Sequence, residues 1–149
     1  MATRVDTRGL EQLHRRLIES WNARDSAAFA ALFESDGHSI GFDGSEMHGP
    51  GEIESTLAQI FDDHETARYV AKIRNVRLLT EDIGFLRAVV GMVPAGQASL
   101  NPDVNAVQTL LAVRSDGDWR ITCLQNTPAQ YHGRPEASEA LTAELSELL

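Results

Sequence analysis

The chain has 149 residues, of which 42% are hydrophobic and 23% charged, a size and composition typical of one globular domain with a single core. Its formal net charge of −9, with only 13 scattered Lys and Arg residues, argues against nucleic acids and membrane surfaces as partners, because both attract clustered positive charge. No apolar run approaches the ~20 residues of a membrane helix, and residues 1–10 lack the apolar stretch of a secretory signal, so we expect a cytoplasmic protein.

The first half of the chain predicts three helices. Apolar residues recur at helical spacing over 7–23 and over 52–64, which is the pattern of a helix that buries one face. Between them, Asp25 can cap a shorter helix over 26–33, because its carboxylate can accept the free amide protons of the first turn. The first two helices are therefore expected to form a helical hairpin.

A short strand and four long strands complete the pattern. Asp36-Gly37 indicates a turn, and a short strand over 38–42 follows it. Compact turns join the first to the second long strand and the third to the fourth, which favours antiparallel neighbours. An irregular segment over 94–104 predicts a loop at the rim of a pocket. The long strands are expected over 69–79, 83–93, 105–114 and 119–127.

These elements predict one α+β domain over 1–149, with a core over about 10–127. Residues 128–149 form a C-terminal tail, in which 137–149 predicts a short acidic helix. A long antiparallel sheet twists and cannot lie flat. We therefore expect a cone-shaped, curved antiparallel sheet wrapped around the three N-terminal helices, with a hollow interior large enough for a ligand.

Several separated stretches of sequence carry a resemblance to known proteins. They are DGHSIGFDGS (36–45), GMVP (91–94), LNP (100–102) with NAVQTL (105–110), and WRI (119–121) with LQNT (124–127). Over about 10–127 the chain resembles the nuclear transport factor 2-like, cystatin-like superfamily, which contains ketosteroid isomerases, SnoaL-type polyketide cyclases and scytalone dehydratase. Within that class it is similar to the actinobacterial SgcJ/EcaC-type proteins, which occur with nine-membered enediyne biosynthesis.

The resemblance implies a pocket for a small, largely apolar organic molecule and a homodimer packed through the convex sheet face. No cofactor and no metal are expected, because the sequence lacks a phosphate-binding Gly-x-Gly-x-x-Gly loop, a His-Glu-x-x-His pair and a Cys-x-x-Cys pair. The oxidoreductase label that some members carry therefore has no physical basis in these residues. Function has to be argued from the site, because this fold hosts both enzymes and binding modules.

Asp43 is the first candidate for chemistry. The resemblance places it where ketosteroid isomerases have their general base, and partial burial would raise its pKa toward neutral pH. Asp43-Gly44-Ser45 can instead form a turn in which the carboxylate accepts a hydrogen bond from its own backbone. Where the oxyanion donors would lie, the chain has Leu17, which donates nothing, and Thr109, a neutral hydroxyl, so steroid-type isomerisation is disfavoured.

Further polar candidates lie on the expected strands. His38 could shuttle a proton or donate to a ligand, or could be a core histidine. Arg87 interrupts an apolar strand and faces either the pocket or a dimer partner. Gln125 and Asn126 are neighbours on the last strand, so only one of them can enter the cavity directly, and Gln125 is preferred because it shares parity with Ile121. The remaining substrate-binding candidates are Trp21, Phe42, Met47, Met92, Asn105 and Thr109.

Two functions are consistent with these residues. One is a cofactor-independent enzyme or accessory factor of the isomerase, cyclase or dehydratase type, acting on an apolar polyketide-derived intermediate with Asp43 as base and His38 or Gln125 assisting. The other is a non-catalytic binding or carrier module of the same pathway. A third possibility, a purely structural partner, predicts an interior packed solid.

Overall fold

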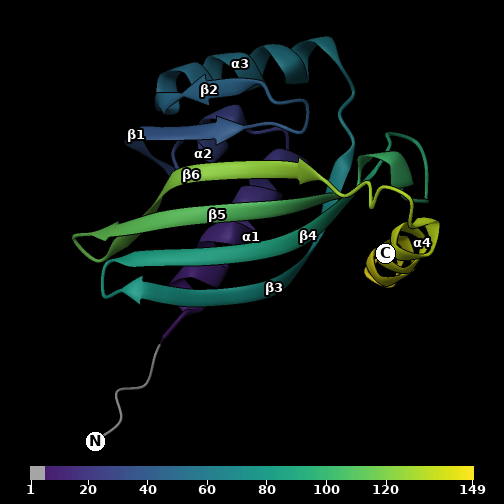
Figure 1. Cartoon of the computed structure of the whole chain (residues 1–149). Coiled ribbons are helices and arrows are strands. Elements are labelled where there is room, and N and C mark those ends of the chain that lie inside the picture. Colours follow the sequence, from purple (N-terminus) through teal and green to yellow (C-terminus); the bar gives the residue numbers. More distant parts are fainter. Residues whose placement is uncertain (1–5) are drawn as a thin grey trace, which may run out of the picture.

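The computed structural model describes residues 6–149, which form a six-stranded sheet and four α-helices. The α+β fold class is confirmed. In Figure 1, α1 runs behind the sheet and α3 lies beyond its β2 edge. The helices are α1 (Arg8–Asn22), α2 (Ser26–Ala30), α3 (Gly49–Asp63) and α4 (Pro135–Ser146), with a short 3-10 helix, η1 (Pro102–Val104). The strands are β1 (Phe33–Ile40), β2 (Glu46–His48), β3 (Arg68–Thr80), β4 (Ile83–Val93), β5 (Ala106–Ser115) and β6 (Asp118–Pro128).

The sheet has the strand order β2-β1-β6-β5-β4-β3. The four long strands β3 to β6 pair antiparallel with their sequence neighbours, as the compact turns predict for β3–β4 and for β5–β6. β1 pairs antiparallel with β2 and parallel with β6. This parallel pair brings the N-terminal strand against the last strand of the chain, so segments far apart in sequence meet in the middle of the sheet.

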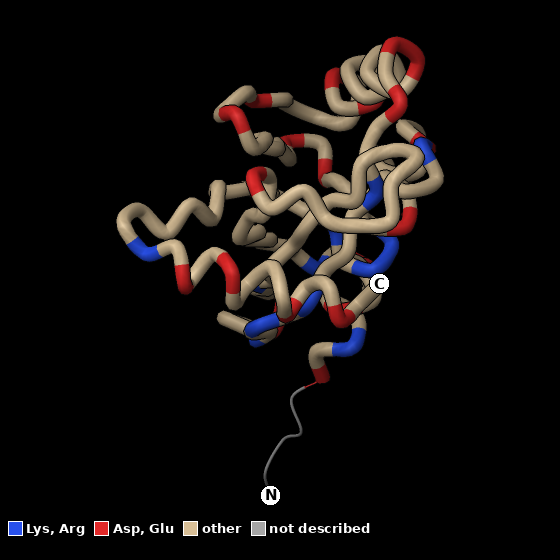
Figure 2. Tube along the Cα trace, turned by 90° about the vertical axis from the view of Figure 1, so that its right-hand side faces the viewer, with Lys and Arg blue, Asp and Glu red and all other residues tan. Residues whose placement is uncertain are grey.

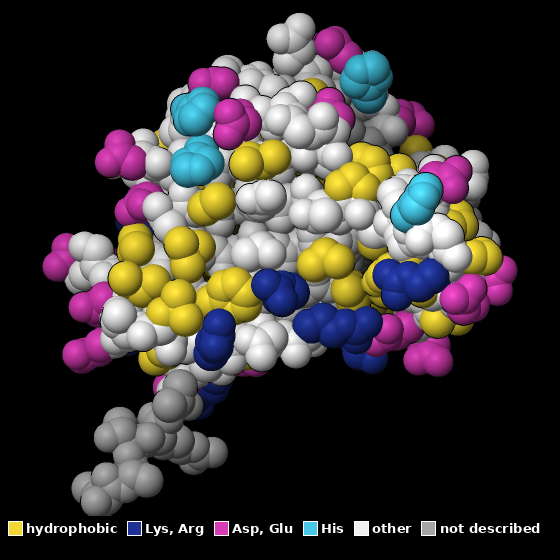
Figure 3. Space-filling view, in the orientation of Figure 1, with side chains coloured by type: hydrophobic (Ala, Val, Ile, Leu, Met, Phe, Trp, Pro, Cys, Tyr) yellow, Lys and Arg dark blue, Asp and Glu magenta, His cyan; other side chains and the backbone are white. Residues whose placement is uncertain are grey.

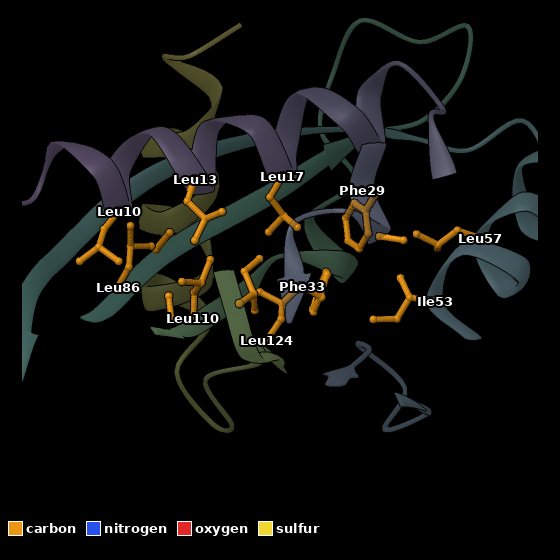
Figure 4. Close-up of a cluster of buried hydrophobic side chains, with 14 of the residues drawn as sticks. Leu10, Leu13, Leu17, Phe29, Phe33, Ile53, Leu57, Leu86, Leu110 and Leu124 are labelled. Carbon is orange, nitrogen blue, oxygen red and sulfur yellow. The ribbon is translucent and has the colours of Figure 1, made fainter. Parts of the chain in front are cut away.

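The apolar stripe of α1 packs against the concave face of the sheet. Leu10, Leu13 and Leu17 of α1 are buried, and Figure 4 shows them pointing toward Leu86 of β4 and Leu110 of β5. Burial of each such side chain contributes roughly 1.5–3 kcal/mol. The helical spacing of these residues therefore fixes which side of α1 faces the sheet.

Two glycines allow the N-terminal half of α1 to lie very close to the sheet. A Cβ at Gly84 would lie 2.5 Å from Leu10 Cδ1, and a Cβ at Gly9 would lie 2.7 Å from Trp119 Cδ1. Neither position has room for a larger side chain. In the C-terminal half of α1, Leu17, Ile18 and Trp21 line a cavity.

The second helix and the turn after it differ from the expectation. The helix ends before Phe33, which instead begins β1, so Asp36-Gly37 lies inside a strand. The register of β1 against β6 shifts between Phe33 and His38, as at a β-bulge, and this shift accommodates the pair. A Cβ at Gly37 would lie 2.5 Å from the carbonyl oxygen of Ile121, so glycine serves the close approach of two strands here.

α4 packs on the outer face of the sheet, opposite α1. Its Leu141 and Leu145 form a second buried cluster with Val89 and Val93 of β4. Alternate residues of β4, such as Ala88, belong to the core on the α1 side, because side chains alternate between the faces of a strand. The helix predicted over 137–149 thus exists, with its start two residues earlier at a proline.

Charge is unevenly distributed over the molecule. Acidic residues mark α3 at one end, and Lys and Arg gather toward the opposite end, on β3 and its surroundings (Figure 2). Among residues 6–149, no helix combines the length and apolar character required to cross a membrane.

Glu144 ties α4 to the edge strand β3. Its carboxylate lies 3.1 Å from Lys72 Nζ and accepts a hydrogen bond of 2.6 Å from Arg74 Nη2. The hydrogen bonds from Arg74 and then from Lys72 lower the pKa of Glu144 to about 2.

Replacing Glu144 with Gln should destabilise the protein at neutral pH. Because the folded pKa lies below the unfolded value of 4.5, the carboxylate stabilises the fold above 4.5, and this contribution is lost as the pH falls toward about 2. Urea denaturation should therefore give unfolding free energies for wild type and Glu144→Gln that differ at neutral pH and converge in acid. Glu147→Gln, at the exposed end of α4, should follow the wild type throughout. A gap that does not change with pH would contradict this assignment.

Candidate functional site

The concave face of the sheet, with α1 and α3, encloses a cavity of about 590 Å³. This volume lies within the range of small-molecule binding sites. Its walls come from the C-terminal end of α1, from β1 and the loop after it, from α3, and from β4, β5 and β6. The interior is hollow, as expected from the curvature of the sheet, which argues against a purely structural role.

An aromatic cluster holds one wall of the cavity in place. The indole N–H of Trp21 donates to the Ala67 carbonyl at 2.9 Å. Its ring makes edge-to-face contacts with Phe61 and Tyr69, at centroid distances of 5.2 and 5.4 Å. Because the ring is held by a hydrogen bond and by two neighbours, Trp21 presents a fixed apolar surface to the cavity.

A hydrogen-bonded row of polar side chains runs from α1 across β5 and β6 to β1. His14 Nε2 lies 2.8 Å from Gln108 Oε1, and Gln108 Nε2 donates to Asn126 Oδ1 at 3.1 Å. Asn126 Nδ2 donates to the Ile40 carbonyl at 3.3 Å. Gln108 and Asn126 line the cavity, and His14 stands behind Gln108. This row is the main polar feature of an otherwise apolar interior.

Burial keeps two titratable groups near the cavity uncharged. It lowers the pKa of His14, which favours the neutral ring, and raises the pKa of Tyr69 to about 12. Tyr69 lines the cavity as a neutral phenol, a group that can donate or accept a hydrogen bond. Neither group carries charge at neutral pH, so the inner part of the cavity is electrically neutral.

Asp43 lies at the mouth of the cavity and is exposed. Its Oδ1 accepts a hydrogen bond of 2.9 Å from the backbone N–H of Ser45, and Gly44 has a φ of 91°. The hydrogen bond from the Ser45 backbone lowers the pKa of Asp43 below 3.8. The geometry is therefore that of the turn, and the carboxylate is a weak base.

Six of the residues singled out from the sequence line the cavity or its mouth. They are Trp21, Phe42, Asp43, Met47, Met92 and Asn126. The other five, His38, Arg87, Asn105, Thr109 and Gln125, are not among the lining residues.

Strand alternation turns His38 away from the cavity. Its neighbour Ser39 lines the cavity, so His38 faces outward, where its ring lies 5.6 Å from that of His48.

Asn105 lies away from the cavity for a different reason. It is buried beneath α4, where its Nδ2 donates to Thr142 Oγ1 at 2.9 Å.

Arg87, Thr109 and Gln125 pair across β4, β5 and β6 on the outer face. Arg87 is exposed, with its guanidinium 5.2 Å from the centre of the Phe85 ring. The expectation that Arg87 faces either the pocket or the outer surface is therefore decided in favour of the outer surface.

A β-bulge explains why Asn126, and not Gln125, enters the cavity. The register shifts between the pairs Leu111–Cys123 and Ala112–Ile121, so β6 has one extra residue, Thr122. Residues beyond the bulge change faces relative to those before it. The parity argument from Ile121 was wrong for this reason.

Sequence reasoning missed Gln108, His14, Tyr69 and Ser39. The sequence pattern could have indicated Gln108. It alternates with Leu110 and Ala112 along an apolar strand, and alternate residues of a strand share one face, so Gln108 belongs to the buried face. His14 lies next to Leu13 and one turn after Leu10 on the buried side of α1, but nothing local shows that it meets Gln108.

The family model described as SnoaL-like domain matches residues 10–128. The chain belongs to the SnoaL-like domain family. No curated protein matches the sequence significantly.

Solved structures similar to this SnoaL-like chain share its nuclear transport factor 2-like, cystatin-like fold. A domain of unknown function with a cystatin-like fold from Nostoc punctiforme has a TM-score of 0.81 and 23% identity over 99% of this chain and 98% of that one. A ketosteroid isomerase-like protein from Erwinia carotovora has a TM-score of 0.65 and 17% identity, covering 83% of this chain and 96% of that one. A candidate scytalone dehydratase from Novosphingobium aromaticivorans has a TM-score of 0.68 and 15% identity, covering 83% of each. At these identities the likeness shows the fold alone.

Burial of His14 should make the stability of this SnoaL-like protein depend on pH. The folded state disfavours the charged ring, so stability is full above the unfolded pKa of 6.5 and decreases as the pH falls below it. NMR titration should give a His14 pKa below 6.5. His14→Gln, which keeps an N–H donor, should reduce the slope of unfolding free energy against pH, whereas His132→Gln in the exposed tail should not. An equal slope in all three proteins would contradict this explanation.

Proposed function

We propose that the protein binds a neutral, largely apolar, polyketide-derived molecule in this cavity and acts as a binding or carrier factor in natural-product biosynthesis. The observation that carries this proposal is the cavity of about 590 Å³, whose inner wall is apolar apart from neutral hydrogen-bonding groups. The resemblance to SgcJ/EcaC-type proteins supports enediyne biosynthesis as the pathway.

The lining favours a flat or polyunsaturated ligand. Trp21, Phe29 and Phe42 offer aromatic surfaces, and Met47 and Met92 add flexible, polarisable thioethers. The described residues that line the cavity include no Lys or Arg, whereas Asp43 and Glu46 stand at its edge. An anionic ligand would be repelled, which makes a neutral molecule the better match.

A second candidate function is proton transfer with Asp43 as the general base. Its supports are the position of Asp43 in the cavity lining and the fold shared with the ketosteroid isomerase-like protein and the candidate scytalone dehydratase. The lowered pKa and the exposure of Asp43 weaken this candidate, because an efficient base has a pKa near the working pH.

The expected homodimer through the convex sheet face stays a prediction. On that face, apolar side chains lie beside Lys and Arg (Figure 3). The guanidinium groups of Arg77 and Arg87 both lie over the Phe85 ring, at 5.3 and 5.2 Å from its centre.

Ligand binding should be blocked by filling the cavity from α3. Thr56 lines the cavity, and Ala58 on the same helix lines a separate depression between α2 and α3, so Thr56→Phe and Ala58→Phe are a matched pair. The fluorescence of Trp21 reports binding in a Trp119→Phe background, because Trp119 is not among the lining residues. With a neutral linear polyene, Thr56→Phe should bind at least about tenfold more weakly, and Ala58→Phe as tightly as its parent. Equal loss in both variants, or no saturable binding by the parent, would refute the cavity as the site.

Turnover separates the two candidate functions. A binding factor should return the polyene with unchanged mass and unchanged ultraviolet spectrum after prolonged incubation. If Asp43 is a catalytic base, a product forms, and Asp43→Asn should lower its rate at least about a hundredfold. The rate should then stay constant through neutral pH and fall only in acid below 3.8, because the pKa of Asp43 is lowered. A product formed equally by wild type and Asp43→Asn would contradict both assignments.

A further inference from the structure

The polar row behind the cavity has a fixed direction. Its last acceptor is the Ile40 carbonyl, which can only accept a hydrogen bond. Asn126 must therefore direct its Nδ2 toward Ile40, and its Oδ1 then faces Gln108. Gln108 in turn must donate from Nε2, which leaves its Oε1 to accept from His14 Nε2. One backbone carbonyl thus determines the orientation of two side-chain amides and the proton position on one imidazole.

This direction leaves one amide hydrogen on Gln108 and one on Asn126 unused by the row, and both residues line the cavity. Each amide nitrogen carries two hydrogens, and the row uses one from Gln108 and one from Asn126. For the second hydrogen, residues 6–149 offer no further acceptor within hydrogen-bond distance. Each amide oxygen already accepts one hydrogen bond, so among the described residues the second amide hydrogens are the polar groups of the row that lack a partner, and this favours a hydrogen-bond acceptor on the ligand.

Gln108 lies deep in the cavity, and Asn126 beside it is half-buried. Gln108 is only 2% exposed, while Phe42 and Asp43 at the mouth are exposed. A ligand oxygen that reaches Gln108 has lost its water, so an unmatched carbonyl there would be costly, whereas a matched one regains its hydrogen bonds. A site built to hydrogen-bond a group discriminates strongly against analogues that lack it.

We propose that Gln108 and Asn126 form a donor subsite that binds a carbonyl oxygen of the ligand, such as that of a ketone, quinone or ester, at the buried end of the cavity. His14 is a positioning residue: by donating to Gln108 Oε1 it prevents the amide from turning and presenting oxygen to the ligand. The subsite rests on the proposed function, because it names the polar group of the molecule that the cavity holds.

The role of His14 depends on its geometry and is reinforced by its surroundings. It is 3% exposed, on the buried face of α1, with Leu13 and Leu17 as buried neighbours on the same helix. The charged residues that line the same surface groove as His14 are Glu11, Arg15 and Glu19 of α1 and Lys72 of β3. In the neutral ring the hydrogen is on Nε2 and Nδ1 carries none; in the protonated ring both nitrogens carry one. Nε2 therefore donates to Gln108 Oε1 in both forms, and the direction of the row is maintained.

The test compares two probes of almost equal shape, fluorenone, which has one carbonyl, and fluorene, which has none. Binding is followed by quenching of Trp21 in the Trp119→Phe background. The Trp119→Phe parent should bind fluorenone about tenfold more tightly than fluorene, because one good hydrogen bond changes affinity by about this factor. Gln108→Met, of similar size, should lose this preference because fluorenone binding weakens relative to fluorene binding.

Infrared spectroscopy gives a readout that a merely structural role would not affect. In the parent complex the carbonyl stretch of fluorenone should move to lower frequency than in an apolar solvent. His14→Leu should reverse most of that shift, and His14→Gln, which restores a donor to Gln108 Oε1, should recover it. Because the wild-type band needs no variant, it decides the proposal even if a substitution prevents folding.

The possible results distinguish failure of the donor subsite from failure of the proposed binding function. Saturable and equal binding of both probes, with an unshifted carbonyl band, would overturn the donor subsite and leave the cavity as a binding site. Absence of saturable binding by either probe or by the polyene would overturn both. A shifted band that persists in His14→Leu but is lost in Gln108→Met would keep the subsite and remove His14 from it.

Discussion

The close contact of α1 with one end of the sheet determines the shape of the whole interior. Gly9 and Gly84 let the first turns of the helix approach Trp119 and β4, where no Cβ would fit. At its other end the helix is held by the hydrogen bond from Trp21 to the Ala67 carbonyl, between the helix and the chain segment before β3. Leu17, Ile18 and Trp21, in the C-terminal half of α1, line the cavity between these two points of attachment.

The polarity of the cavity follows from how water is excluded from it. A buried carboxylate would need a charged partner, and none of the described lining residues is basic. The inner wall therefore holds neutral groups: the amides of Gln108 and Asn126 and the phenol of Tyr69. Among the described lining residues, the charged ones are Asp43 and Glu46, both at the edge, where solvent reaches them. Such a gradient, apolar and neutral inside and acidic at the mouth, suits recognition of a neutral molecule better than the generation of a strong base.

The two faces of the sheet have separate roles because strand side chains alternate. On β4, Ala88 belongs to the core beneath α1, whereas Val89 packs against α4. On β5, Gln108 faces the cavity and Thr109 faces out, in a row with Arg87. Residues on the outer face can therefore change the stability of α4 or the association of the protein without touching a bound molecule.

The sequence by itself determined the elements, their order and the fold class, because helical and strand periodicities are local properties of the chain. The cap of α2 is an example: Asp25 accepts the Ala28 N–H at 3.0 Å, as its position predicts. The tertiary structure alone decided which polar residues meet. The extra residue at Thr122 reversed the faces of Gln125 and Asn126, and packing of α1 on β5 joined His14 to Gln108 across 94 positions of sequence. Strand register and helix placement depend on contacts between distant segments, and a single residue of register moves every later side chain to the other face.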